Sequence, residues 1–93
     1  MAAAEVNSVA SRRFWELFNA LPDDIQKLAV KNYHLWRSNP NHPSLRFRRL
    51  RSSSDRFSIR VGDHYRALGR LTEDTILWVW IGTHAEYDRL VNS

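Results

Sequence analysis

The sequence contains no cysteine, and only three glycines and three prolines among its 93 residues. The absence of cysteine excludes disulfide bonds, zinc–thiolate centres and thiol catalysis. The low glycine and proline content, with 43% hydrophobic residues, excludes collagen-like and low-complexity chains and is typical of a globular protein. A chain of this length predicts a single domain, residues 1–93, of marginal stability, because a small domain buries only a modest share of its surface.

Long apolar runs are also missing, and none approaches the roughly 18 residues that span a bilayer. The first ten residues, MAAAEVNSVA, lack the basic stretch and the continuous apolar core of a signal peptide. We therefore expect a cytoplasmic protein with no membrane partner. The four histidines show no spacing typical of metal ligands, so we expect neither a metal nor another cofactor.

Positive charge is concentrated in one part of the chain. Residues 45–70 hold eight arginines against two aspartates, whereas residues 71–93 carry a net negative charge. Arginine binds phosphate through a planar fork and stacks on bases, so a polyanion, most simply nucleic acid, is the expected partner. The alternative interpretation is a solvated strand face whose charges pair in part with the acidic C-terminal residues.

Apolar periodicity predicts two helices in the first half of the chain. Residues 10–20 carry apolar side chains at helical spacing, and after Pro22 a second apolar stripe runs from Ile25 to Trp36. The link between the two helices is short, which predicts an antiparallel hairpin. Residues 3–9 are interpreted as a short edge strand or a frayed terminus.

The pattern then changes to the alternation of β-strands. Strands are expected over Leu45–Arg48, Phe57–Val61, Tyr65–Leu71 and Ile76–Ile81, with a short helix capped by Thr83 and running through Val91. This order predicts an α+β fold in which an N-terminal helical hairpin packs on an antiparallel β-sheet meander, followed by a short C-terminal helix. The opposite face of the sheet is expected to carry much of the arginine cluster.

The four tryptophans fall within these predicted elements. Trp15 and Trp36 lie in the helices and are interpreted as packing residues. Trp78 and Trp80 are two residues apart on one strand, which predicts that they share a face. For this pair a core role is favoured over a platform for unpaired bases.

Candidate chemistry gathers on the sheet face and at its C-terminal edge. RNA cleavage without a metal needs a group that deprotonates the 2′-hydroxyl, an acid for the leaving oxygen, and cations that stabilise the phosphorane. Histidine carries protons near neutral pH, tyrosine stacks on bases, and arginine supplies charge. The alternative to these functional roles is that the histidines are simply exposed and that the tyrosine ring packs on the sheet. The candidate residues are Arg46, Arg48, Arg60, Arg66, His64, His84 and Tyr87.

The sequence resembles the RelE/ParE superfamily of bacterial toxins from type II toxin–antitoxin modules. The resemblance covers most of the chain, from about Phe14 to Val91. It is carried by LPDDI at 21–25, NP at 39–40, LRFRRL at 45–50, SIRVG at 58–62, YRAL at 65–68 and IGTHAEY at 81–87. The combination of the YR strand with the IGTHAEY segment is fairly specific.

The resemblance implies a RelE-like, metal-independent endoribonuclease that cleaves mRNA on the ribosome. It implies that Arg66 contacts the reacting phosphate and that His84 and Tyr87 are catalytic. Because RelE has lysines where this chain has arginines, proton transfer falls to His84. The resemblance also implies a cognate antitoxin, a separate chain that covers the basic face. The basic residues that it implies on the first strand of the meander are Arg46, Arg48 and Arg49.

Two other functions remain open on the sequence. ParE-like members of the superfamily inhibit DNA gyrase and cleave no RNA, and a degenerate binding module would keep the same fold. The presence of His84 and Tyr87 next to Arg66 favours the ribonuclease.

Overall fold

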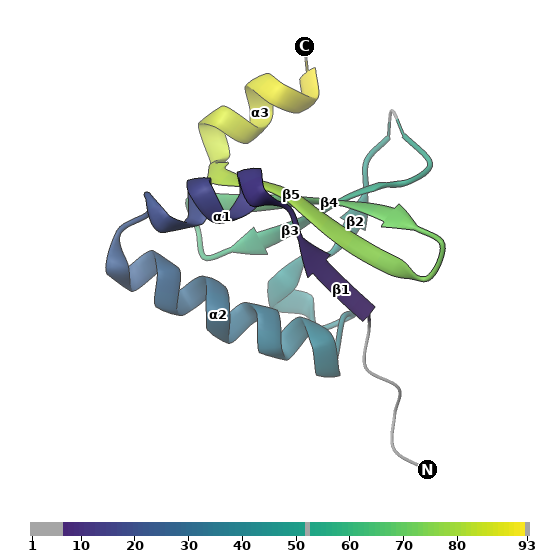
Figure 1. The fold of residues 1–93 in the computed structure, drawn as a ribbon, viewed down its shortest axis with the longest axis horizontal. Helices are drawn as coiled ribbons and strands as arrows, with labels where there is room; N and C mark the ends of the chain where they lie inside the picture. Colours follow the sequence, from purple (N-terminus) through teal and green to yellow (C-terminus); the bar gives the residue numbers. More distant parts are fainter. Residues whose placement is uncertain (1–6, 52, 93) are drawn as a thin grey trace.

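The structure is a computed structural model that describes residues 7–51 and 53–92. The described elements are β1 (Asn7–Ala10), α1 (Arg12–Asn19), α2 (Asp23–Ser38), the 3₁₀ helix η1 (Pro43–Leu45), β2 (Arg48–Arg49), β3 (Arg56–Val61), β4 (Tyr65–Thr72), β5 (Thr75–Thr83) and α3 (His84–Asn92). The strands form one sheet in the order β1-β5-β4-β3-β2 (Figure 1). The predicted α+β fold is confirmed.

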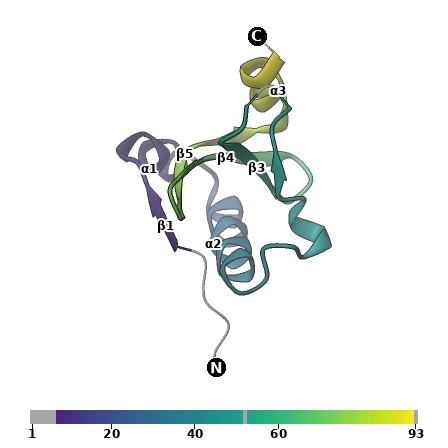
Figure 2. The ribbon, with the colours of Figure 1, turned by 90° about the vertical axis from the view of Figure 1, so that its right-hand side faces the viewer.

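The helices lie on both sides of the sheet. Figures 1 and 2 show α2 along one face and α3 beyond the other, with α1 beside β1 and β5. Helix α1 begins after Ser11, whose hydroxyl accepts a hydrogen bond from the backbone N–H of Phe14 at 3.1 Å. Helix α2 begins after Pro22 and carries Asp23 and Asp24 in its first turn, where the helix dipole favours negative charge. The expected helical hairpin is present.

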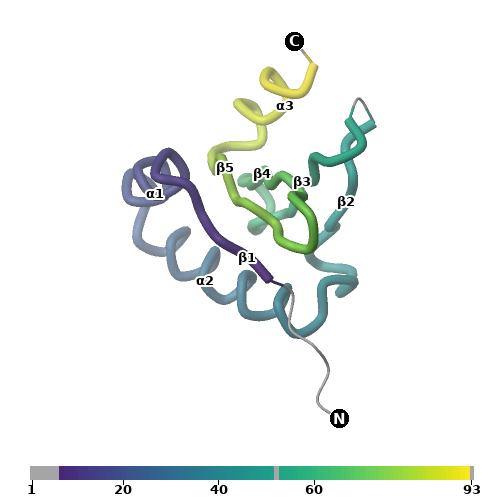
Figure 3. The backbone as a smooth tube through the Cα atoms, turned by 45° about the vertical axis from the view of Figure 1, so that its right-hand side comes forward, coloured from purple at the N-terminus to yellow at the C-terminus, as the bar shows by residue number. Residues whose placement is uncertain are grey.

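The first strand of the sheet lies beside the last one. β1 runs parallel to β5, with Asn7 opposite Thr75 and Ala10 opposite Trp78. The expected N-terminal edge strand is thus found within its described part, beside β5 (Figure 3), and residues 3–6 of that prediction lie outside the described residues. All other strand pairs are antiparallel, so the sheet is mixed.

The core is centred on Trp36, which is completely buried in α2. Its ring meets the edge of Trp78 from β5 at 5.1 Å between centroids, and the edge of Phe47 at 5.6 Å. Leu45 from η1 and Ile81 from β5 are also buried in the same cluster. One indole therefore joins the second helix, the connection that follows it and the central strands.

Trp15 does not have the buried packing role that its helical position predicts. It is 50% exposed, although its ring packs edge-on against Phe14 and Phe18. Helix α1 has only two turns and packs against β5, which leaves an apolar cavity of about 280 Å³ between α1, α2 and the sheet. Trp15, Val9 and Val30 line this cavity and are exposed. The helix-covered face is therefore not fully closed.

The predicted strand Leu45–Arg48 is wrong in most of its length. Leu45 ends the 3₁₀ helix η1, and Arg46 has a left-handed backbone with φ of 46°. β2 is reduced to Arg48–Arg49. The alternation of apolar and basic residues is real, because Leu45 is buried and Arg46 exposed, but a turn and a short strand produce it.

Trp78 and Trp80 do not share a face, contrary to the sequence prediction. The register of β4 and β5 shifts between Leu68 and Gly69, which face Trp80 and Trp78 respectively. A β-bulge at Val79 therefore sends the two rings to opposite faces of the sheet. Trp78 enters the core beside Trp36, whereas Trp80 lies on the other face against α3.

Helix α3 follows β5 directly. The expected cap at Thr83 is confirmed, because its hydroxyl accepts a hydrogen bond from the Glu86 N–H at 3.2 Å. The Glu86 carboxylate in turn accepts hydrogen bonds from the backbone N–H and the hydroxyl of Thr83, which lower the pKa of Glu86. None of the helices in the described part of the chain is long and apolar enough to cross a membrane.

Candidate nucleic-acid interface

Basic side chains gather on the sheet face opposite α2. In β3, Phe57, Ile59 and Val61 face the helices, so Ser58 and Arg60 face the other way. Cross-strand partners share a face, which extends this surface to neighbouring strands. We call the surface the arginine face, and its members are Arg48, Arg56, Ser58, Arg60, Arg66 and Arg70.

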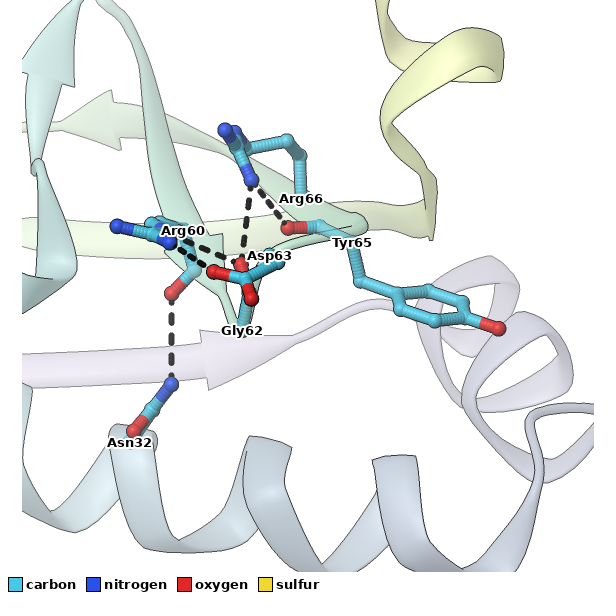
Figure 4. Close-up of polar contacts among 6 residues, drawn as sticks. All are labelled: Asn32, Arg60, Gly62, Asp63, Tyr65 and Arg66. Carbon is cyan, nitrogen blue, oxygen red and sulfur yellow. Dashed lines mark hydrogen bonds and ion pairs between the residues drawn. The ribbon is translucent and has the colours of Figure 1, made fainter.

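Arg60 and Arg66 stand directly opposite each other on the arginine face. Arg66 is also opposite Gly82 on β5, so the residue that faces it there carries no side chain. Figure 4 shows Arg66 directed away from α2, whereas Tyr65 points toward the helices. The orientation of Arg66 that the alternation predicts is confirmed.

The turn that joins β3 to β4 holds this arginine pair in place. The carbonyl oxygen of Gly62 accepts a hydrogen bond from Arg60 Nε at 3.0 Å and a longer one from Arg66 Nη1 at 3.4 Å (Figure 4). Arg66 Nη1 also donates to the carbonyl of Tyr65 at 2.8 Å. Gly62 has φ of 65°, and a Cβ there would lie 2.6 Å from the end of the Leu28 side chain, so both the backbone conformation and the space favour glycine.

The charges around Arg66 show which residues lie close to it. Partial burial lowers the pKa of Arg66, and the positive charges of Arg60 and Arg46 lower this pKa further. Tyr87 and Asp88 act on the same pKa in the opposite direction. Three predicted site residues, Arg46, Arg60 and Tyr87, are thus brought together with Arg66.

His84 lies at the start of α3, where β5 ends. Its ring is 6.2 Å from that of Tyr87, and its Nε2 is 3.4 Å from Oδ1 of Asp88 one turn along the helix. Its backbone N–H donates to the carbonyl of His64 at 2.7 Å, which joins α3 to the turn before β4. His84 is about half exposed, so a ligand can reach the imidazole.

The remaining predicted residues divide between the two faces. Arg48 pairs with Ser58 and belongs to the arginine face. Arg49 pairs with Phe57, and its guanidinium lies 5.4 Å above that ring, on the helix-covered side. The His64 side chain is exposed in the β3–β4 turn. Arg49 is therefore the predicted site residue that the fold separates from Arg66.

Sequence reasoning missed two carboxylates at this site. Asp63 forms an ion pair with Arg60, three residues earlier in the chain, and Asp88 pairs with His84. The His84–Asp88 spacing of four residues on a helix is a signal that could have identified the second pair. The Arg60–Asp63 pair spans a turn, and its geometry depends on the backbone at Gly62.

The site contains no ready-made metal centre within residues 7–51 and 53–92. No group of three or more histidine, aspartate or glutamate side chains is arranged to hold a metal ion there. The chemistry that these residues supply is phosphate binding by arginine, proton transfer by histidine and stacking by tyrosine.

Comparison with solved structures identifies the fold. The toxin–antitoxin complex DinJ–YafQ of E. coli matches with a TM-score of 0.70 and 14% identity, over 88% of this chain and 96% of the matched chain. A double arginine-to-alanine variant of E. coli toxin RelE in the free state matches with a TM-score of 0.69 and 13% identity, over 94% of this chain and 93% of the matched chain. The RelB–RelE complex of Methanococcus jannaschii matches with a TM-score of 0.68 and 20% identity, over 87% of this chain and 96% of the matched chain.

Sequence comparison identifies the family. No curated protein sequence matches this chain significantly. Residues 23–89 match the model of the ParE-like toxin domain, which covers α2, the whole meander and most of α3. The chain therefore belongs to the ParE-like toxin domain family, within the RelE/ParE toxin superfamily.

Proposed function

We propose that this protein is the toxin of a type II toxin–antitoxin module and acts as a metal-independent, ribosome-dependent mRNA endoribonuclease that inhibits translation in the cytoplasm. The observation that carries the proposal is the position of His84, paired with Asp88 and beside Tyr87, at the edge of the arginine face that holds Arg66. A proton carrier and a phosphate-binding cation are among the groups that this reaction requires.

The roles follow from the chemistry of each group. Arg66 stabilises the negative charge that develops on the phosphorane, because its guanidinium is anchored on backbone carbonyls before the ligand arrives. His84 transfers the proton, since arginine does not release one near neutral pH. Tyr87 stacks on a base. Arg46, Arg48 and Arg60, with His64 at the turn, bind the RNA backbone.

A cognate antitoxin is the proposed protein partner. Solved structures of similar fold contain RelE with RelB and YafQ with DinJ. For this chain, an antitoxin segment with acidic residues would cover the arginine face by charge complementarity and block access of RNA to Arg66. Whether a small antitoxin-like reading frame adjoins the gene is the first observation to make, and expression of the toxin with and without such a reading frame would test the pairing through growth arrest and its reversal.

The decisive experiment is single-turnover cleavage of mRNA on programmed ribosomes, with wild-type protein and His84→Gln, across roughly pH 5 to 8. Glutamine keeps a hydrogen-bonding side chain but cannot transfer a proton, so cleavage should slow strongly while RNA binding stays nearly unchanged. His34→Gln is the matched control, because it removes an exposed imidazole from α2, on the opposite side of the sheet. Equal rates for wild type and His84→Gln would remove His84 from the mechanism.

Inhibition of DNA gyrase is the second candidate function, and the match to a ParE-like domain favours it. A gyrase inhibitor needs contacts rather than proton transfer, so His84→Gln would show no selective loss of chemistry. Induced expression with parallel readout of mRNA cleavage and gyrase-dependent DNA breaks separates the two functions. DNA breaks without mRNA cleavage would transfer the assignment to gyrase.

A further inference from the structure

The carboxylate of Asp63 occupies a position on the arginine face where an anion of the ligand is expected. Asp63 Oδ1 forms an ion pair with Nη2 of Arg60, while Nε of the same guanidinium donates to the Gly62 carbonyl at 3.0 Å (Figure 4). The Arg60 side chain is 25% exposed and that of Asp63 is 76% exposed. The Nε/Nη2 edge of the guanidinium is thus shared between a backbone carbonyl, which binds Nε, and an exposed carboxylate, which binds Nη2.

The backbone anchor of Arg60 does not depend on Asp63. Asn32 of α2 donates to the carbonyl of Arg60 at 3.5 Å, and the Gly62 carbonyl is oriented by its left-handed backbone. The same carbonyl accepts from Arg66, so the turn also sets the spacing of the two guanidiniums. If the carboxylate leaves, the Arg60 guanidinium keeps its place beside Arg66.

The mutual repulsion of the pair favours a bound anion. Like charges directly opposite each other in a sheet destabilise it, and Arg60 and Arg66 occupy such a position. A carboxylate and a phosphate both match the guanidinium fork, and a phosphate has oxygens enough to contact two guanidiniums. An exposed ion pair contributes little to stability, so the exchange of carboxylate for phosphate costs little.

We propose that Asp63 is a displaceable stand-in for phosphate: it occupies Nη2 of Arg60 in the unbound protein, and a backbone phosphate of the nucleic acid replaces it on binding. This inference rests on the proposed nucleic-acid function of the arginine face. It makes Asp63 a competitor of the ligand for Arg60, so its removal tightens binding rather than weakening it.

The test is a fluorescence anisotropy titration of a labelled single-stranded RNA oligonucleotide at several salt concentrations. Asp63→Asn should bind the RNA about two- to fivefold more tightly than wild type at low salt. This is the change in affinity that corresponds to the free energy of one exposed ion pair. The slope of log affinity against log salt should stay close to that of wild type, because the same phosphate contact to Arg60 forms in both proteins. Asp63→Glu keeps the carboxylate and should remain close to wild type.

Two controls separate this mechanism from a general charge effect. Glu73→Gln removes the same charge from the exposed β4–β5 turn and should leave affinity and slope nearly unchanged. In an Arg60→Gln background, Asp63→Asn should have no further effect, because the partner through which it acts is missing. A merely structural role for Asp63 would instead lower thermal stability and weaken binding.

The outcomes distinguish the two proposals. Equal affinity for wild type and Asp63→Asn, or the same gain in the Arg60→Gln background, would overturn the role of Asp63 and leave the nucleic-acid function standing. Wild-type protein without salt-dependent RNA binding would overturn the nucleic-acid function itself, and the role of Asp63 with it.

Discussion

The two faces of the sheet are built from the same strands but perform different tasks. In β3, Ile59 and Val61 are buried beneath the helices, whereas Ser58 and Arg60, which alternate with them, belong to the arginine face. The helix-covered face is stabilised by apolar burial around Trp36. The exposed ion pairs of the arginine face contribute little to the free energy of unfolding. Stability and ligand binding can therefore be changed separately, by adjacent residues.

The largest effect is expected on the helix-covered face. Trp36→Ala should lower the free energy of unfolding by about 3–5 kcal/mol, because it removes a fully buried indole that contacts Trp78 and Phe47. Chemical denaturation followed by circular dichroism measures this change. Trp36→Phe should retain a larger share of the stability. A Trp36→Ala protein as stable as wild type would contradict the central place of this residue in the core.

The opposite result is expected for Arg66. Arg66→Ala should reduce mRNA cleavage about 10²- to 10³-fold, because a cation that stabilises the transition state is lost, while unfolding changes little. Arg56→Ala, at the other end of the same face, is the control and should cleave nearly as wild type. Growth-arrest and cleavage assays measure the activity of each variant, and a thermal melt measures its stability. An Arg66→Ala protein that folds normally and still arrests growth would remove the catalytic assignment.

Arg48 and Arg49 test the separation of the faces with two adjacent residues. Arg48→Gln should reduce the slope of log affinity against log salt by about 0.7 for single-stranded RNA, since one phosphate contact is lost. Arg49→Gln removes the same charge from the helix-covered side and should leave the slope nearly unchanged. Fluorescence anisotropy titrations of both variants at several salt concentrations measure these slopes. Equal slopes for the two variants would show that the register of β2 does not determine RNA contact.

The smallest effect is expected at Asp55, beside Arg70. Hydrogen bonds from the Ser53 hydroxyl, at 2.7 Å, and from Arg70 Nε, at 3.0 Å, lower the pKa of Asp55 below its ordinary value of 3.8. The carboxylate therefore stabilises the fold above that value, and this contribution is lost as the pH falls through the folded pKa.

Asp55→Asn removes this acid-labile contribution. The variant should be slightly less stable than wild type at neutral pH, and the difference between the two should shrink below about pH 4. Thermal melts across the acid range measure it. A difference that stays constant down to the lowest pH would mean that the charge of Asp55 contributes nothing.

Periodicity predicted the elements whose burial follows a regular spacing. Both N-terminal helices and strands β3 and β4 were predictable because a single face of each is apolar. Strand β5 was predictable from its almost wholly apolar run, and the C-terminal helix from its cap at Thr83. The same alternation placed Arg66 on the face away from the helices. These predictions depend only on residues close together in the sequence.

Errors occurred where one residue changes the backbone path. The left-handed conformation of Arg46 turned an apparent strand into a 3₁₀ helix and a two-residue strand, and the bulge at Val79 reversed the face of Trp80. No propensity identifies such a position, because the bulge is defined by its partner strand. The ion pair of Arg60 with Asp63 was missed for a similar reason, since it depends on a turn.

The parallel pairing of β1 with β5 has a consequence for the order in which this protein is made. Asn7 is synthesised long before its partner Thr75. Contacts between such distant segments form late and slow folding. The surroundings of Arg66 are likewise completed only by Gly82 of β5 and by Tyr87 and Asp88 of α3. The arginine face is therefore assembled around Arg66 only after β5 and the first turns of α3 have been synthesised.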